Sequence, residues 1–598
     1  MRLTSPDILV IALYGVVVLA LGVVFARRAG RSVEDYFLAG RRLPWWIAGT
    51  SMAATWFAAD APLATAGIVR ERGLYANWLW WYEGTGLMML VFFYAKLWRR
   101  AGIITDAELI ELRYSGRPAA ILRGFSALYQ GLLRNAVVMG WVMLAMVKFS
   151  QVLLGWNPAF TLTVCVLTAL VYTAAAGLWG VAATDLLQFV VGMAGSLVLA
   201  GIVLATVGGG GALVDAIRAL PEAGPGALDL VPSPARVGPL ELGSFACLIL
   251  FLWVRSGQGD GYLAQRLFAA RDERHAMMGA LWFAFAGIVL MTWPWIVVGL
   301  GSLIVLPAST AGEALAADPE LAYPMMIGEL MPAGLRGLVV AAFLAAFMST
   351  MDTHLCWGAS YLVNDVYRRF MRRAADESHY VRVSRIAVAL LAVLAALVAW
   401  QMTSIQRAWI YVIELTAGIA FVWLLRWYWW RVNAWAEIVA MAGSVLLANG
   451  GALVGLADRL GLVPAAFADS VALFYGSEYD FLRATVIVLV CTILWVAVAL
   501  STRPDDADVL EAFYRRVRPG GWWGPVAAAA GDVVVDGSSA TRWLGFFLGT
   551  VFLYTSLLGV GYGLTGRPVA GAVLLALSGV AGLLTLKVAR REGTAAAP

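Results

Sequence analysis

Long apolar runs constrain this chain most, because about fifteen of them are long enough to cross a lipid bilayer. A membrane-spanning helix needs about 20 consecutive, mostly apolar residues. Hydrophobic residues make up 61% of the 598 residues and charged residues only 14%, which excludes an ordinary soluble globule. We therefore predict an all-α polytopic membrane protein. The predicted spans are 7–26, 43–68, 78–98, 122–150, 158–177, 180–207, 240–256, 277–305, 334–363, 381–402, 404–424, 433–457, 481–501, 541–564 and 568–588.

The distribution of lysine and arginine between the predicted loops indicates the orientation of the chain. Basic residues gather in alternate loops, which hold Arg27, Arg28, Arg31, Arg41 and Arg42; Lys96, Arg99, Arg100, Arg113 and Arg117; Arg266, Arg271 and Arg274; Arg368, Arg369, Arg372, Arg373 and Arg382; and Arg426 and Arg431. Because basic loops stay on the cytoplasmic side, we expect the N-terminus outside and the C-terminus in the cytoplasm, in the cell (inner) membrane. The net charge of +5 then arises from cytoplasmic loops and does not indicate nucleic-acid binding.

The predicted span 334–363 carries a polar cluster in its middle. Ser349, Thr350, Asp352, Thr353 and His354 occur together in a run that is otherwise apolar. Polar side chains within a membrane helix are costly and mark sites of function. By their spacing, Ser349, Asp352 and Thr353 share one helix face. His354 lies off that face; we interpret it as an interhelical contact, with proton sensing as the alternative.

Two predicted spans are interrupted by polar or helix-breaking residues. Thr55–Pro62 interrupts the span 43–68, and Arg255–Gly261 follows the span 240–256. Paired interruptions in two halves predict an inverted-repeat transporter whose binding site lies at the unwound segments. The predicted units are an extra N-terminal transmembrane helix and cytoplasmic loop (1–42), a first repeat of five spans (43–207), an extracytoplasmic loop (208–239), a second repeat of five spans (240–424), and about four C-terminal helices (425–598) with a cytoplasmic loop at 502–540.

No motif in the chain predicts an enzyme. We find no nucleophile–base pair and no metal-ligand cluster, and the loop 502–540 is too short for an enzymatic domain. The four cysteines fall within predicted spans without CxxC spacing, so neither a disulfide framework nor a zinc site is expected. Two aromatic runs, 78–82 and 427–430, lie at span ends and are typical of membrane-interface belts.

Four stretches resemble the sodium:solute symporter family. They are EDYFLAGRRLPWW (34–46), VAATDLLQ (181–188), DGYLAQR (260–266) and AAFMSTMDTHLCWGASYLVNDVY (345–367). The resemblance extends over roughly residues 5 to 500. It implies a LeuT-type 5+5 inverted repeat with one extra helix before the first repeat.

The resemblance implies a sodium ion between the first and eighth helices of the core. At the matching positions, the ligands are the backbone carbonyls of Ala54, Phe57 and Ala346 and the hydroxyls of Ser349 and Thr350. A hard cation prefers oxygen ligands, which agrees with this set. The alternative is that the two hydroxyls only bond back to carbonyls of their own helix.

A second sodium site is implied by some members of the family. Asp185, Asp352 and Thr353 match its position, and Asp352 stands where the family has a hydroxyl. Two carboxylates at one site repel each other unless a cation or a shared proton lies between them. A tighter cation site and a protonated Asp352 are both open, and so is a structural salt bridge from Asp352 to Arg134 or Arg255.

The solute contacts implied by the resemblance come from five core helices. The matching residues are Trp56, Asp60, Glu83, Arg134, Gln258, Asp260 and Glu414. Arg134 suits a carboxylate, whereas Asp60 and Glu83 favour a cationic or polyhydroxyl solute; a purely structural role for each is the alternative. Trp56 and Asp60 depart from the pattern of well-known members, so a sugar or proline specificity is not carried over.

We therefore predict a sodium-coupled symporter that imports a small polar organic solute by alternating access. The expected solute is a sugar, an amino acid or an organic acid. The other expected partners are the sodium ion and the lipid bilayer, with no nucleic acid and no obligate protein partner. Alternatives are a transporter-fold sensor, which would signal by ligand-dependent shape change, and a proton-coupled transporter.

Overall fold

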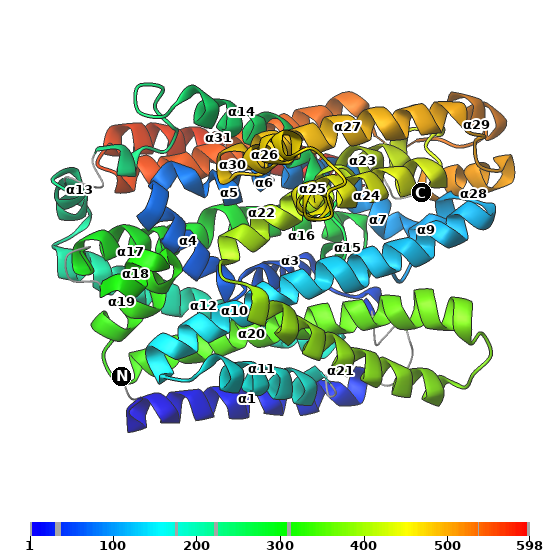
Figure 1. Ribbon diagram of the computed structural model, residues 1–598. Coiled ribbons are helices and arrows are strands. Elements are labelled where there is room, and N and C mark those ends of the chain that lie inside the picture. The colour runs from blue at the N-terminus through cyan, green and yellow to red at the C-terminus, as the bar shows by residue number, and fades with distance from the viewer. Residues whose placement is uncertain are drawn as a thin grey trace.

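The computed structural model describes residues 3–29, 38–173, 178–220, 225–307, 312–535 and 537–594, and these residues form helices joined by short connections (Figure 1). Within these ranges the only β pairing is two isolated bridges, Leu43–Ala270 and Trp429–Trp522. Most helices lie alongside one another in a bundle, and the marked N and C ends lie at opposite ends of it (Figure 1). The predicted all-α fold is confirmed. Arg31 and the stretches 34–37 and 174–177 lie outside the described residues.

The first half of the bundle follows the N-terminal helix α1 (Ser5–Ala29). Its helices are α3 (Trp45–Trp56), α4 (Asp60–Arg72), α5 (Trp78–Trp81), α6 (Glu83–Met89), α7 (Ala95–Ala101), α8 (Glu108–Arg113), α9 (Gly116–Leu128), α10 (Asn135–Leu154), α11 (Pro158–Thr173) and α12 (Leu178–Val207). Helices α6 and α7 are joined by a π-helical segment, η3 (Leu90–Tyr94), and α9 and α10 by another, η4 (Tyr129–Arg134). The predicted interruption of the span 43–68 is confirmed, because α3 and α4 meet at a bend of 57°.

The second half follows α13 (Gly210–Arg218). It comprises α14 (Pro239–Phe251), the 3-10 turn η6 (Leu252–Ser256), α15 (Tyr262–Ala269), α16 (Glu273–Phe285), the π-helical η7 (Ala286–Leu290), α17 (Thr292–Val305), α18 (Gly312–Ala317), η8 (Pro319–Leu321), α19 (Ala322–Leu330), α20 (Leu335–Ser360), the π-helical η9 (Tyr361–Met371), α21 (Glu377–Gln401), α22 (Ile405–Ala417) and α23 (Ala420–Tyr428). The second predicted interruption is also confirmed, but the helix resumes as α15, which the predicted span 240–256 omitted.

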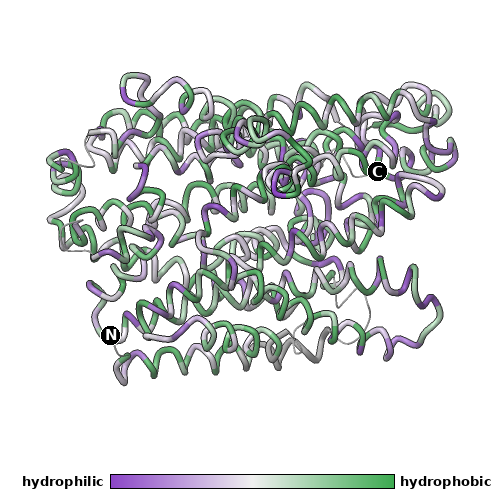
Figure 2. The backbone as a smooth tube through the Cα atoms, viewed as in Figure 1, coloured by the Kyte–Doolittle hydropathy of each residue, from purple (hydrophilic) through white to green (hydrophobic). Residues whose placement is uncertain are grey.

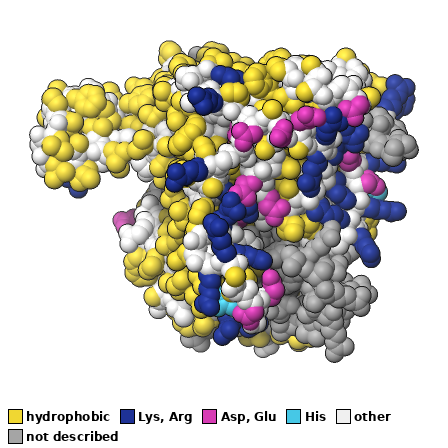
Figure 3. Space-filling view, turned by 90° about the vertical axis from the view of Figure 1, so that its right-hand side faces the viewer, with side chains coloured by type: hydrophobic (Ala, Val, Ile, Leu, Met, Phe, Trp, Pro, Cys, Tyr) yellow, Lys and Arg dark blue, Asp and Glu magenta, His cyan; other side chains and the backbone are white. Residues whose placement is uncertain are grey.

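The C-terminal part comprises α24 (Ala434–Ala448), α25 (Gly450–Arg459), α26 (Ala465–Phe474), α27 (Asp480–Ser501), α28 (Ala507–Val517), α29 (Gly524–Ala529), α30 (Ser539–Leu564) and α31 (Pro568–Thr594). The predicted loop 502–540 is therefore partly helical, and Trp523 within it is buried against Phe513. Helices α25 and α26 have no buried residue and stand away from the bundle as a hydrophobic projection (Figure 3).

The membrane-spanning character of the helices is clear, although their exact number stays a prediction. Among the described residues, nine helices are long and apolar enough to cross a membrane, or up to twelve if each of three bent pairs is one span. Figure 2 shows hydrophobic residues along most of the helices. Lys and Arg gather on the end of the molecule that Figure 3 presents, which carries α28 in Figure 1.

Tyr428, Trp429 and Trp430 are half-buried, but the first aromatic run and Trp427 are buried and do not form interface belts. Trp81 and Trp427 have no exposed surface, and Trp78 and Trp80 are each 8% exposed. The ring of Trp427 packs edge-on against Trp98 with 4.6 Å between centroids. The interface interpretation was wrong for these residues, because their rings fill the interior between helices.

Helices α22 and α23 form a single bent rod that is fixed at both ends. They meet at 43° around Gly418, where a Cβ atom would lie 2.6 Å from the Sγ of Cys491. At one end, Glu320 of η8 accepts backbone N–H groups of α22, including that of Ile405 at 2.9 Å. At the other, Arg113 donates to backbone carbonyls at the end of α23 and just beyond it.

Candidate functional site

The first break exposes backbone oxygens inside the protein. Pro62 explains why α3 cannot continue into α4, because proline lacks an N–H and its ring would clash with the carbonyl of Ala58; in the first turn of α4 it is tolerated. Ala54 and Phe57, at the end of α3, are 2% and 4% exposed. No described residue donates a hydrogen bond to either of their carbonyls. These two buried oxygens can therefore serve as ligands without losing a hydrogen bond.

Thr350 of α20 lies next to this end of α3. Its Oγ1 lies 3.2 Å from the carbonyl oxygen of Thr55 and 3.0 Å from that of Ala346. Thr350 thus makes the expected bond back to its own helix, but it also reaches the broken helix. The structure therefore brings Ala346 and Thr350 next to the C-terminal end of α3, where the carbonyls of Ala54 and Phe57 lie.

Ser349 makes a different contact and does not bond back to its own helix. Its hydroxyl donates to Oδ1 of Asp185 on α12, and Ser51 of α3 donates to Oδ2 of the same carboxylate at 2.5 Å. All three side chains are buried. Asp185 thus joins α3, α12 and α20. A hydroxyl that donates its proton still offers lone pairs to a cation.

The chain itself supplies a cation at Asp185. Arg266 of α15 is 1% exposed, and its Nη2 lies 3.7 Å from Oδ2 of Asp185. The same guanidinium donates to Ser51 Oγ at 3.2 Å and to Thr353 Oγ1 at 3.0 Å. The sequence analysis placed Arg266 in a cytoplasmic loop; the structure corrects this, because α15 carries the side chain into the interior.

Asp352 is also buried on α20, 2% exposed, and its charge acts on Arg266. Neither Arg134 nor Arg255 forms the salt bridge to Asp352 that was the alternative, since each pairs with another carboxylate. The guanidinium of Arg266 is therefore a cation that reduces the repulsion between Asp352 and Asp185.

His354 forms the predicted interhelical contact. Its ring Nδ1 lies 2.6 Å from Oδ1 of Asn135 on α10. The side-chain amide of Asn135 also donates to the backbone carbonyl of His354 at 2.8 Å. Two hydrogen bonds to one residue thus fix this histidine between α20 and α10.

Asp60, the first residue of α4, lies among tryptophans. Its Oδ2 accepts the indole N–H of Trp409 at 2.9 Å, and its Oδ1 has no hydrogen-bond partner among the described residues. The rings of Trp56 and Trp80 are stacked with centroids 4.7 Å apart, and Trp80 lies 5.3 Å from Trp409. We call Trp56, Trp80 and Trp409 the tryptophan cluster. Asp60 is only 3% exposed.

The other predicted solute contacts are engaged within the protein. Arg134 pairs with Asp260, Glu83 with Arg255, and Glu414 with Arg483, while the amide oxygen of Gln258 accepts from Arg426 and Trp427. Among the described residues, no hydrogen bond or ion pair joins any of them to Asp60. Each instead joins two segments that are far apart in the sequence.

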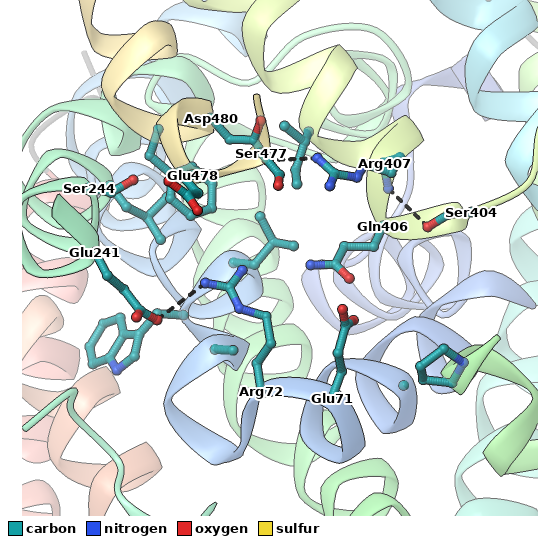
Figure 4. Close-up of a pocket in the computed structure, with 18 of the residues that line it drawn as sticks. Glu71, Arg72, Glu241, Ser244, Ser404, Gln406, Arg407, Ser477, Glu478 and Asp480 are labelled. Atoms are coloured by element: carbon teal, nitrogen blue, oxygen red, sulfur yellow. Dashed lines mark hydrogen bonds and ion pairs between the residues drawn. The ribbon is translucent and has the colours of Figure 1, made fainter. Parts of the chain in front are cut away.

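A cavity of about 1110 Å³ opens further along α4 and α22. We call it the vestibule. Its charged lining consists of six carboxylates, Glu71, Glu241, Asp318, Glu320, Glu478 and Asp480, and two guanidinium groups, Arg72 and Arg407. Figure 4 shows the ion pairs of Arg72 with Glu241, at 3.5 Å, and of Arg407 with Asp480, at 3.2 Å.

Comparison with known proteins identifies the family. The model of the sodium:solute symporter family matches residues 36–446, which is more than half of the chain. The chain belongs to this family. It is 27% identical over 467 residues to a sodium/glucose cotransporter of Vibrio parahaemolyticus, covering 74% of this chain and 84% of that protein. It is 28% identical over 422 residues to sodium/glucose cotransporter 4 of Mus musculus, covering 66% of this chain and 60% of that protein.

A solved structure shows the fold of this sodium:solute symporter. A sodium-coupled sialic acid symporter in a substrate-bound, outward-open state superposes with a TM-score of 0.66 at 19% identity, covering 84% of this chain and 99% of that one. The LeuT-type fold is thereby confirmed. The protein is a multi-pass membrane symporter with sodium as its coupling ion, and it is not an enzyme.

The sequence analysis missed several residues of this symporter's interior. Arg266 was visible in the stretch DGYLAQR, where the glycines of the break precede a short run ending in a basic residue. Trp80 was hidden in a run that resembled an interface belt. Trp409 carried no signal of its own, because its contact with Asp60 joins residues 349 positions apart.

Proposed function

We propose that this symporter binds its coupling sodium ion at the first break and imports a small polar organic solute by alternating access. The observation that carries the proposal is the pair of buried carbonyl oxygens at Ala54 and Phe57 without donors among the described residues, next to Thr350 and Ala346. Neutral oxygens around a dry site suit an alkali cation, which needs several oxygen ligands and little net charge. Ser349 completes the proposed set.

We propose a single sodium ion for each transport cycle. At the second position, Asp185, Asp352 and Thr353 surround Arg266, whose guanidinium already neutralises part of the carboxylate charge. A second sodium there would sit close to a fixed positive charge, which raises the free energy of binding. The arrangement therefore favours one ion over two.

We propose that the solute binds beside the first break, at Trp56 and Asp60. The buried carboxylate with a free oxygen and the adjoining aromatic rings supply polar and apolar contacts in one place. The residues Glu83, Arg134, Gln258, Asp260 and Glu414, which the resemblance also suggested, are proposed to hold helices together instead, since each has an internal partner.

We propose that the protein lies in the cell membrane in the orientation that the basic loops predict, with the N-terminus outside and the C-terminus in the cytoplasm. We also propose that its two repeats comprise residues 43–207 and 240–424. A cysteine placed in the 312–318 segment should react with an impermeant maleimide in intact cells. One placed in the segment 372–376 should react only after permeabilisation. The opposite labelling pattern would refute the orientation.

The direct test of the proposed function is solute uptake into proteoliposomes. Purified full-length protein is given an inward sodium gradient, or an equal potassium gradient as the control, with a panel of labelled sugars, amino acids, organic acids and amines. We expect uptake of at least one solute above its equilibrium level with sodium and none with potassium. Equal uptake under both gradients would refute sodium coupling.

A further inference from the structure

We propose that the solute of this symporter is an organic cation, whose ammonium group binds between the carboxylate of Asp60 and the tryptophan cluster. This inference rests on the proposed function, because it assigns a chemical class to the solute of the same site. Three observations support it: the carboxylate of Asp60 has no ionic partner, the tryptophan cluster lies next to it, and carboxylates outnumber basic groups in the vestibule.

The carboxylate of Asp60 lacks a counter-charge within the protein. It is 3% exposed, its Oδ1 has no hydrogen-bond partner, and no described lysine, arginine or histidine forms an ion pair with it. Buried carboxylates in membrane proteins are otherwise paired, as Asp260 is with Arg134. A positively charged ligand would supply the missing partner. A neutral solute could donate a hydrogen bond to Oδ1, but only a cation would also balance the buried charge.

The tryptophan cluster reaches this carboxylate through the indole N–H of Trp409, and Trp80 and Trp56 pack next to that ring. Trp80 is held by a hydrogen bond from its indole N–H to the carbonyl of Gly287 at 3.2 Å, and Trp409 by its bond to Asp60. Gly287 also makes room for Trp56, because a Cβ atom there would lie 2.5 Å from the indole ring. Tryptophan is the side chain that best attracts a cation to its face, and aromatic cages select quaternary ammonium groups.

The vestibule leads toward this site and carries a surplus of carboxylates. Gly67 of α4 lines it, and Asp60 lies two turns deeper on the same helix. Among the described residues, Glu71 and Glu478 form no ion pair, whereas Arg72 and Arg407 each have an acidic partner. A cavity lined by one sign of charge concentrates ligands of the opposite sign and raises their rate of association.

The basic groups near the breaks do not favour an anionic solute. Arg134 is paired with Asp260, and Arg266 is buried with Asp185. A solute carboxylate at Asp60 would face a like charge with no guanidinium free to offset it. The tryptophan rings are packed on one another in this structure, so loading requires Trp56 to part from Trp80.

The test compares a cation with its neutral isostere. Purified full-length protein in sodium-containing detergent buffer is titrated with choline, with tetramethylammonium, with ethanolamine, with 3,3-dimethyl-1-butanol as the uncharged analogue of choline, and with D-glucose. Binding is followed by calorimetry, and uptake by proteoliposomes under a sodium gradient. We expect at least one of the three cations to bind, and choline to bind at least about a hundredfold more tightly than 3,3-dimethyl-1-butanol.

Two variants of the site test the contributions of the carboxylate and of the aromatic rings separately. Asp60→Asn should weaken binding of the cation about a hundredfold, because it removes the charge and keeps the shape. Trp56→Leu should weaken it about tenfold. Asp469→Asn on α26, an exposed carboxylate, is the matched control and should bind as the parent does. If Asp60→Asn fails to fold, Trp56→Leu still tests the site.

Three outcomes would overturn the inference. They are binding of D-glucose or the butanol with an affinity similar to that of choline, cation binding that survives Asp60→Asn, and no cation binding in protein that sodium stabilises against heat. Sodium-driven uptake of a neutral solute would leave the proposed symport intact and refute only the solute class. Cation binding that depends on Asp60 but not on sodium would refute the coupling and leave the solute class standing.

Discussion

The first and second broken helices differ in how their buried polar groups are satisfied. At the first break, between α3 and α4, two carbonyls lack donors and Asp60 lacks a cation among the described residues. At the second break, between η6 and α15, Asp260 pairs with Arg134, and Arg266 a few residues later meets Asp185. The charged groups of the second break are therefore paired within the chain, and only the amide nitrogen of Gln258 lacks a partner among its described side chains. The first break instead leaves oxygens for ligands from outside.

In a transporter, oxygens without partners in the empty protein are best placed where no buried ion pair holds the helices together. Breaking a buried ion pair costs several kcal/mol, so the helices that it joins stay together unless both partners move. Unpartnered carbonyls and a lone buried carboxylate destabilise the empty protein, but they gain the most free energy when a cation binds. The four variants below test whether the first break binds ligands and the second holds the bundle.

The largest effect is expected from Arg266→Met. The change leaves Asp185 and Asp352 buried without their fixed cation, and we expect it to lower the free energy of unfolding by about 3–5 kcal/mol. The measurement is the midpoint of unfolding in detergent. Arg271→Met, at an exposed position two residues beyond α15, is the control. Partial recovery in the double variant with Asp185→Asn would support the charge argument, and an unchanged midpoint for Arg266→Met would contradict it.

A smaller loss is expected from Arg134→Ala at the second break. The pair with Asp260 is partly exposed, with 18% and 16% of the side chains accessible, so we expect a loss of about 1–3 kcal/mol in stability. The double variant Arg134→Ala, Asp260→Ala should lose little more stability than either single variant, which a double-mutant cycle would measure as a favourable interaction energy. If Arg134 bound the solute directly, Arg134→Lys would raise the KM for uptake with stability unchanged. That result would contradict the purely structural role of the second break.

At the first break, Thr350→Val should weaken sodium binding. The change keeps the shape of the side chain but removes one oxygen, and we expect the sodium concentration for half-maximal uptake to rise about tenfold, which corresponds to about 1.4 kcal/mol. Solute affinity should recover at saturating sodium, because the coupling between the two ligands is reciprocal. The control is Thr416→Val, since Thr416 bonds only to carbonyls of its own helix. A shift in both variants would mean general damage to the fold.

The smallest effect is expected in the vestibule. Glu71→Gln combined with Glu478→Gln should slow uptake of an organic cation about two- to threefold at low solute concentration, because the cavity attracts it less. Raising the ionic strength at constant sodium should remove the difference from the parent, since salt screens exposed charges. Glu377→Gln, an exposed residue of α21, is the control. A loss of rate that salt does not remove would place these two residues in the binding site itself.

Local chemistry predicted the two breaks, but not what surrounds them. Pro62 and the glycines between Arg255 and Gly261 are helix breakers that act wherever they stand. In contrast, α15 has only eight residues and includes Gln265 and Arg266, so its hydropathy resembles that of a loop. Whether Arg266 points to water or to Asp185 depends on the packing of α12 and α20, which are distant in the sequence.

The tryptophans illustrate the same limit of local reasoning. Trp80 and Trp427 lie where their runs meet the predicted ends of spans, and a sequence cannot distinguish a ring at a membrane interface from one between helices. In the folded protein both rings are buried between helices. The ligand hydroxyls on α20 were proposed from the family resemblance, whereas the tryptophan cluster required the fold.

The bent rod of α22 and α23 connects the first break to the vestibule. The end of α23 is held by Arg113, while α22 carries Trp409 and is bound through the backbone N–H of Ile405 to Glu320 of η8. Glu320 also pairs with Lys148 of α10, so this one carboxylate joins the first turn of α22 to η8 and to α10. Because Glu320 also lines the vestibule, a shift of α22 that carried Trp409 away from Asp60 would strain the hydrogen bonds between α22 and Glu320, so the cover of the buried carboxylate and the wall of the cavity are mechanically connected.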